Sequence, residues 1–199
     1  MSAANLHEVR AVTANYFFWQ GWRWVPMGVF LCATAAVFSG AWVPPVVKDW
    51  GIWILLGVTL WLSTTVLGRY YRRTFGDVRA DADQHARRTS IKWLVIYPAM
   101  LASMVADMKL ALPLLLSGIV WGVSIELYRR STGGGRLHYA VAAVLLAVLG
   151  LLPLAGLPFT GRAGVNLLLG VVGLVYIVGG LLDHRALVRI LKAPSPATD

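Results

Sequence analysis

The feature that most constrains this chain is a series of long apolar runs, separated by short segments rich in charge, proline or glycine. Of its 199 residues, 58% are hydrophobic and only 14% are charged, whereas a typical soluble domain has about 45–50% apolar and about 25% charged residues. So few polar side chains cannot cover apolar runs of this length with a water-facing surface. The pattern excludes a soluble globular domain and predicts an all-α integral membrane protein.

The apolar runs divide into six candidate spans, because a membrane helix needs roughly 17–25 mainly apolar residues. Asp107 and Lys109 lie near the middle of the stretch 91–127 and favour a tight hairpin there, since a charge at mid-bilayer costs about 2.5–3.5 kcal/mol on insertion scales. We expect one polytopic domain, a six-helix bundle arranged as three helical hairpins, with spans at about 25–42, 50–68, 91–106, 110–127, 137–155 and 164–182.

Positive charge predicts the orientation of this bundle. With six spans, 15 of the 18 Lys and Arg residues fall on the side that holds both termini, the 69–90 loop, the 128–136 loop and the 183–199 tail. Loops rich in Lys and Arg stay in the cytoplasm. We therefore expect both termini to be cytoplasmic and the protein to lie in the inner or plasma membrane, in a bacterium by its Ala, Val, Leu and Arg content. The same distribution accounts for the net charge of +9 without nucleic-acid binding.

The expected cytoplasmic edges carry clusters of arginine. The 69–90 loop begins aromatic and basic, becomes acidic in its middle and ends basic again, and a basic pair follows the fourth span. Such basic flanks bind anionic lipid headgroups, at about 1 kcal/mol per residue near the surface. The acidic middle offers a docking site for a protein partner. The candidate lipid or partner contacts are Arg69, Arg72, Arg73, Arg87, Arg88, Arg129 and Arg130.

Ionisable residues within spans are functional candidates, because a charge inside the bilayer is costly. Glu126 and Asp107 are the candidates for a transport or proton site. For Glu126, we favour an interfacial ion pair with Arg129 and Arg130, which follow at i+3 and i+4. For Asp107, we favour a solvated hairpin turn.

Three side chains near the cytoplasmic ends of the last two spans, His138, Asp183 and His184, lie at one depth in this topology, because consecutive antiparallel helices are normally neighbours. They are candidates for a metal site or a proton relay. The His-x-x-x-His and Glu-x-x-His spacings that preset ligand geometry on one helix are absent. We therefore expect ordinary helix-end histidines and no metal or other cofactor.

Small residues at helical spacing predict close helix packing in the last three spans. This packing fits the inside of one bundle as well as a homo-oligomer. The residues are Gly118, Gly122, Ala143, Ala147, Gly170, Gly173, Gly179 and Gly180.

The sequence offers no catalytic constellation, since no nucleophile has a base at a matching depth and no metalloprotease or phosphate-loop motif occurs. We expect a small non-enzymatic accessory, scaffold or regulatory membrane subunit that acts through its basic cytoplasmic loops. The alternative is a small-solute or ion transporter or channel. Its path would use backbone carbonyl groups that are freed by the prolines Pro98, Pro113 and Pro153. It would also use a polar stripe on the second span, formed by Thr59, Ser63 and Thr64.

Overall fold

The computed structural model describes residues 16–40, 51–76, 92–110, 114–131, 136–156 and 161–191, and within these ranges every regular element is a helix. Three helices are long and apolar enough to cross a membrane, at Gly21–Phe38, Leu137–Ala155 and Ala163–Leu191, and a shorter apolar helix covers Leu94–Asp107. Because a soluble protein does not carry several such helices, this architecture indicates a membrane location. The predicted loop contacts Arg87 and Arg88 lie outside the described residues.

Within the described ranges, the residues are almost entirely helical. A short α-helix and a 3-10 turn, α2 and η1, lead into α3, and π-helical turns occur at η3 and η4. The bounds are α2 Tyr16–Trp19, η1 Gly21–Arg23, α3 Val25–Phe38, α4 Ile52–Trp61, η3 Leu62–Val66, α5 Leu67–Phe75, η4 Lys92–Ile96, α7 Tyr97–Lys109, α8 Leu115–Ser131, α9 Leu137–Leu151, η5 Leu152–Ala155 and α10 Gly161–Leu191.

Several helix ends differ from the predicted spans. α3 stops at Phe38, where Gly40 soon follows with a left-handed φ of 83°, a conformation that ends helices. α8 starts at Leu115 and not at 110, because Leu114 takes a left-handed φ of 59°. α10 continues to Leu191, well past the predicted span end at 182. At 1.5 Å per residue, its 31 residues extend about 46 Å, more than the roughly 30 Å of a bilayer core.

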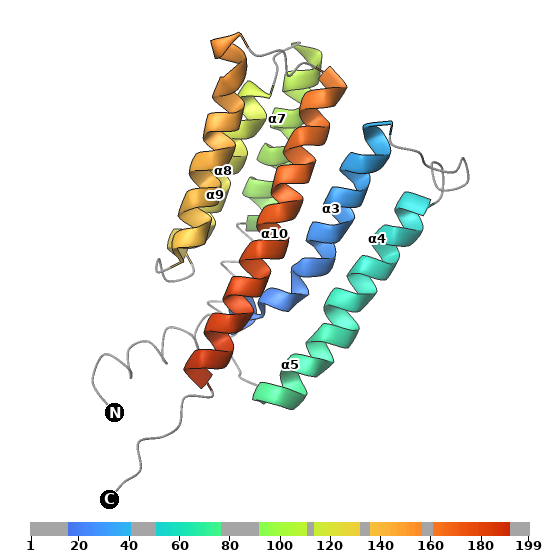
Figure 1. The fold of residues 1–199 in the computed structure, drawn as a ribbon, viewed down its shortest axis with the longest axis vertical. Coiled ribbons are helices and arrows are strands. Elements are labelled where there is room, and N and C mark those ends of the chain that lie inside the picture. The colour runs from blue at the N-terminus through green and yellow to red at the C-terminus, as the bar shows by residue number, and fades with distance from the viewer. Residues whose placement is uncertain are drawn as a thin grey trace, which may run out of the picture.

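The helices pair across the predicted hairpins as well as within them. α3 packs along α10 and α8 along α9, while α4 packs on α3 and α7 on α8 (Figure 1). The first long helix thus lies against the last one. This pairing joins segments that are far apart in the sequence. It was not predicted, because the predicted hairpins pair only consecutive spans.

Small residues make these two close contacts; the sequence predicted small packing surfaces on α8, α9 and α10 but not on α3. A Cβ atom on Gly28 would lie 2.5 Å from the Gly173 carbonyl oxygen, and one on Gly122 would lie 2.7 Å from the Ala143 carbonyl oxygen. Gly118 meets the backbone of Gly150 in the same way. The predicted small surfaces of α8 and α9 therefore face each other within one chain.

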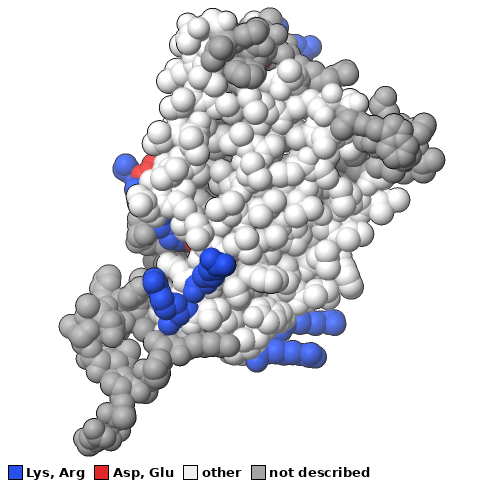
Figure 2. Space-filling view, viewed as in Figure 1, with Lys and Arg blue, Asp and Glu red and all other residues white. Residues whose placement is uncertain are grey.

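The charged surface is concentrated at one end of the molecule. In Figure 2, most of the visible basic side chains lie at the end where α5 and the last turns of α10 meet, and uncharged surface covers much of the rest of this face. Arginines on these two helices are exposed there, and we call this surface the basic end: Arg69, Arg72, Arg73, Arg185 and Arg189.

Candidate functional site

A buried carboxylate, Asp183 of α10, is the centre of the main polar cluster. Its side chain is fully buried, and its Oδ2 accepts hydrogen bonds from Arg136 Nη1 at 2.8 Å and from Tyr139 Oη at 2.8 Å. Arg136 directly precedes α9, and Tyr139 lies in the first turn of α9. The cluster therefore ties the beginning of α9 to the late part of α10.

Aromatic rings surround the guanidinium of this pair. The Arg136 Cζ lies 4.8 Å from the ring centroid of Trp19, 5.5 Å from that of Tyr128 and 5.3 Å from that of Tyr139. A cation over an aromatic face is stabilised by the ring quadrupole, most strongly where water is excluded. The ion pair between α9 and α10 is thus also in contact with two further elements, α2 and α8.

Two of the three candidate metal ligands come close together. His138 Nε2 lies 3.2 Å from Asp183 Oδ1, but without the geometry of a hydrogen bond. His184 follows Asp183 directly on α10, where successive side chains point about 100° apart, and it bonds elsewhere. Within the described ranges, no three His, Cys, Asp or Glu side chains lie close enough to hold a metal ion. Asp183 instead forms an ion pair with Arg136.

His184 joins α10 to a different neighbour. Its Nδ1 lies 2.8 Å from the Tyr71 hydroxyl, which also accepts a hydrogen bond from the Trp22 backbone N–H at 3.1 Å. Tyr16 donates a further hydrogen bond to the Tyr71 carbonyl oxygen at 3.2 Å. Burial raises the pKa of the Tyr71 phenol above its ordinary value, so this hydroxyl stays protonated. Asp183 and His184 together connect α10 to α9 on one side and to α5 and η1 on the other.

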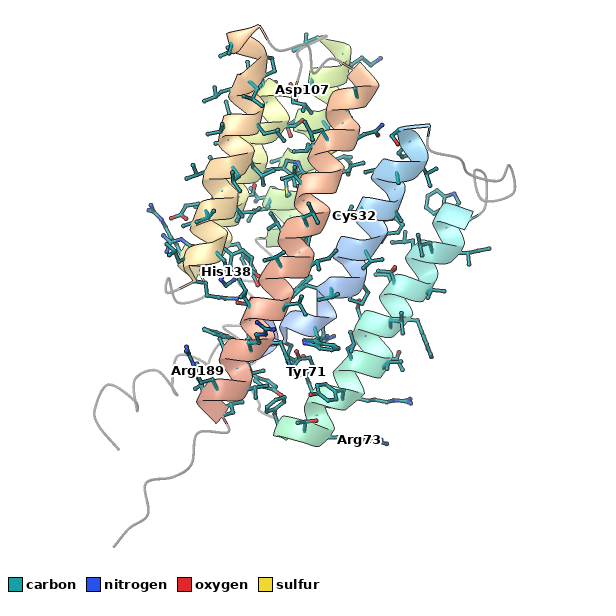
Figure 3. The ribbon with its side chains drawn as sticks, in the orientation of Figure 1. Cys32, Tyr71, Arg73, Asp107, His138 and Arg189 are labelled. Carbon is teal, nitrogen blue, oxygen red and sulfur yellow. The ribbon has the colours of Figure 1, made fainter. Side chains whose placement is uncertain are left out.

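Asp107 is buried, and the expectation of a solvated turn at this residue is wrong. The side chain lies in the last turn of α7 and is 4% exposed. Its two carboxylate oxygens accept hydrogen bonds from the backbone N–H groups of Leu116 at 3.1 Å and Ser117 at 2.7 Å. These N–H groups begin α8 and have no partner within that helix. Asp107 caps α8 from the neighbouring helix, at the opposite end of the bundle from His138 and Tyr71 (Figure 3).

This capping role predicts a difference between two substitutions of Asp107. Asp107→Ala removes both acceptors and should lower stability by about 0.5–2 kcal/mol, the usual cost of losing a helix N-cap. Asp107→Asn keeps one acceptor oxygen and should cost less. Thermal unfolding in detergent, followed by circular dichroism, measures both variants. Equal losses in the two would mean that the negative charge matters more than the cap.

Glu126 forms the predicted ion pairs near the end of α8. Its carboxylate bonds Arg129 Nε at 2.6 Å and Arg130 Nε at 2.7 Å. The Glu126 side chain is 26% exposed and that of Arg130 is 73% exposed, so this cluster lies at the surface. Arg129 and Arg130 both pair with Glu126. One of their two positive charges is therefore neutralised within the chain, and less charge is left there for lipid or partner binding.

The most important contact that the sequence analysis missed is the pair of Arg136 and Asp183. Arg136 was counted as one more cytoplasmic charge, and Asp183 was placed at a helix end. A signal was present, since Asp183 stands only one turn after Gly179 and Gly180 in a continuous helical pattern. Nothing local identifies the partner, because Arg136 lies 47 residues away along the chain.

The fold and the cluster define a class: over its described residues, the protein is helical, has three helices long and apolar enough to cross a membrane, and pairs the buried Asp183 with Arg136. No family model, no curated protein and no solved structure matches this chain.

Proposed function

We propose that this chain is a non-enzymatic multi-pass membrane protein that serves as an accessory, scaffold or regulatory subunit of a membrane complex. The observation that supports this most is that all three carboxylates of the described residues, Asp107, Glu126 and Asp183, are engaged by partners within the chain. A proton or cation carrier needs an ionisable group that faces its path. These carboxylates instead fix one helix to another or pair with surface arginines.

The proposed topology has six spans with both termini in the cytoplasm of a bacterial cell. The position of the basic residues supports it: the start of α9, the end of α10 and α5 are joined at one end through the contacts of Asp183 and His184. These are the segments that positive charge assigns to the cytoplasm. Lys109 ends α7 and lies with Asp107 at the opposite end.

The basic end is the surface proposed to bind the partner. Arg69, Arg72 and Arg73 are exposed on α5, while Tyr71 of the same helix is fully buried against Tyr16 and Leu187. The buried tyrosine holds α5 in place, so its arginines stand on a rigid element. A fixed array of guanidinium groups suits an acidic protein surface, which it can bind through paired hydrogen bonds.

Neutralising two of these arginines tests the proposal. We expect the tagged protein, extracted gently from its own host membranes, to retain a second protein at fixed stoichiometry in native mass spectrometry. The double variant Arg69→Gln with Arg73→Gln should bind it about tenfold more weakly, because exposed ionic contacts contribute up to about 1 kcal/mol each.

The matched control replaces the same two residues with lysine, which keeps the charge and should retain most of the partner. If the native chain carries no protein partner, or if the glutamine variant retains it unchanged, the accessory role through the basic end is wrong. Loss of bound anionic lipid alone would assign the basic end to the membrane surface.

A further inference from the structure

A cavity of about 480 Å³ lies between the helix pair α3 and α4 and the helix pair α7 and α8. Its walls come from α3, α4, η3, α7, α8 and α10 and are almost entirely apolar. Four of the lining side chains are Met27, Leu31, Met100 and Met104. The volume falls within the range of small-molecule sites, about 300–1,000 Å³. Methionine is flexible and polarisable, so a wall rich in it adapts to an apolar chain of variable shape.

The cavity is bordered by exposed apolar side chains and not by a polar rim. Leu60 of α4 and Leu101 of α7 both line it, and they are 47% and 65% exposed. α4 packs on α3 and α7 packs on α8, so the two leucines belong to separate helix pairs. In a membrane, such an edge faces lipid tails, and a ligand that enters there comes from the bilayer.

One part of the lining is cationic. Arg23 lines the cavity, and its Nε donates a hydrogen bond to the Ser63 carbonyl oxygen at 3.0 Å while its Nη1 donates one to Gln20 Oε1 at 2.9 Å. A phosphate group accepts paired hydrogen bonds from a guanidinium group such as that of Arg23.

The backbone around the cavity departs from regular α-helix in two places. The π-helical turn η3 supplies Ser63 and Thr64 to its wall, and the π-helical turn η4 ends at Ile96, directly before the lining residue Tyr97. Such turns are rare in helices and frequent at functional sites. Among the described residues, no hydrogen-bond partner is found for two buried polar atoms of the lining residues, Ser63 Oγ and Trp121 Nε1. Buried polar groups normally have a partner, so a ligand with polar atoms would complete this site.

We propose that this cavity binds one anionic membrane lipid, with its phosphate at Arg23 and one hydrocarbon chain between α3 and α7. The apolar walls and the exposed leucine edge match the hydrocarbon part of such a molecule, and the Arg23 guanidinium matches its phosphate. The site is separate from the outer faces of α5 and α10, and its occupancy does not depend on a protein partner.

Lipid titration followed by native mass spectrometry tests this site. The full chain, delipidated in detergent, is titrated with dioleoyl phosphatidylglycerol and with dioleoyl phosphatidylcholine. We expect one phosphatidylglycerol to bind at least about tenfold more tightly than phosphatidylcholine, because the phosphatidylglycerol headgroup is net anionic, whereas the choline group of phosphatidylcholine adds a positive charge that Arg23 repels. Arg23→Gln should remove most of this preference, and Met104→Trp, which fills the cavity, should remove the tight site itself.

Two substitutions serve as matched controls, because neither residue lines the cavity: Arg73→Gln removes an exposed charge, and Val144→Trp adds a bulky side chain on an exposed position of α9. Both should keep the tight lipid. Circular dichroism checks that Met104→Trp folds, and the smaller change Met104→Phe replaces it otherwise. Equal affinity for the two lipids, or an unchanged tight site in the folded cavity-filling variant, overturns the proposal.

Discussion

Replacing Asp183 with alanine is expected to destabilise the protein more than any other single change to its charged residues. The substitution leaves the Arg136 guanidinium buried, 3% exposed, without its carboxylate. Breaking a buried ion pair by removing one partner costs about 3–5 kcal/mol, because an uncompensated charge stays in a low-dielectric site. We expect a markedly lower thermal midpoint in detergent, measured by the loss of helical circular dichroism.

Two comparisons isolate the cause of that loss. Arg185→Gln changes an exposed residue only two positions further along α10 and should have little effect. The double variant Asp183→Leu with Arg136→Met removes both charges and should be more stable than Asp183→Ala, because no unpaired charge remains. A midpoint for Asp183→Ala that matches the native protein would show that the pair does not hold α9 to α10.

Gly118→Ala is the second substitution with a large expected effect. A Cβ atom at this position would meet the backbone of α9, with Gly150 N at 2.6 Å and Leu146 O at 2.7 Å. Backbone atoms cannot move aside as a flexible side chain can, so α8 and α9 must separate. Overpacking of this kind costs about 1–3 kcal/mol, and we expect a lower midpoint in the same thermal unfolding measurement.

Gly57→Ala is the matched control for this prediction. Gly57 also lies inside a helix, α4, but nothing lies within 4 Å of a Cβ atom there. Alanine is a better helix former than glycine by about 0.5–1 kcal/mol, so this variant should be as stable as the native protein or slightly more so. If the two alanine variants behave alike, the close approach of α8 and α9 is not real.

The apolar runs and small residues predicted a large part of the fold. Each of the six apolar runs contains a helix in the structure. This is expected, because a helix satisfies the hydrogen-bonding groups of its own backbone in an apolar environment. The steps at Gly118 and Gly122 predicted close packing, and α9 supplies the matching surface at Gly150 and Ala143. The number of spans was predicted from the apolar runs and their orientation from charge, and both stay predictions.

The candidate site was harder to predict, because its contacts join distant parts of the chain. Asp107 stands next to Met108 and Lys109 at a helix end, a pattern typical of a solvated turn. Only the fold shows that the first N–H groups of α8 reach back to this carboxylate. Glu126 was predictable, because its partners follow at i+3 and i+4 on the same helix. Local ion pairs can be read from spacing, and long-range ones such as that of Asp183 cannot.

The central claim is that Asp107 and Asp183 join helices, that Glu126 pairs with neighbouring arginines, and that none of these three carboxylates carries an ion across the membrane. The most direct test is proton and cation flux into proteoliposomes that contain the purified chain, with empty liposomes and the Asp107→Asn and Glu126→Gln variants beside it. The account predicts no flux above that of empty liposomes for any of the three proteins. Protein-dependent flux in the native chain that either substitution changes, while the variant stays folded, would contradict it.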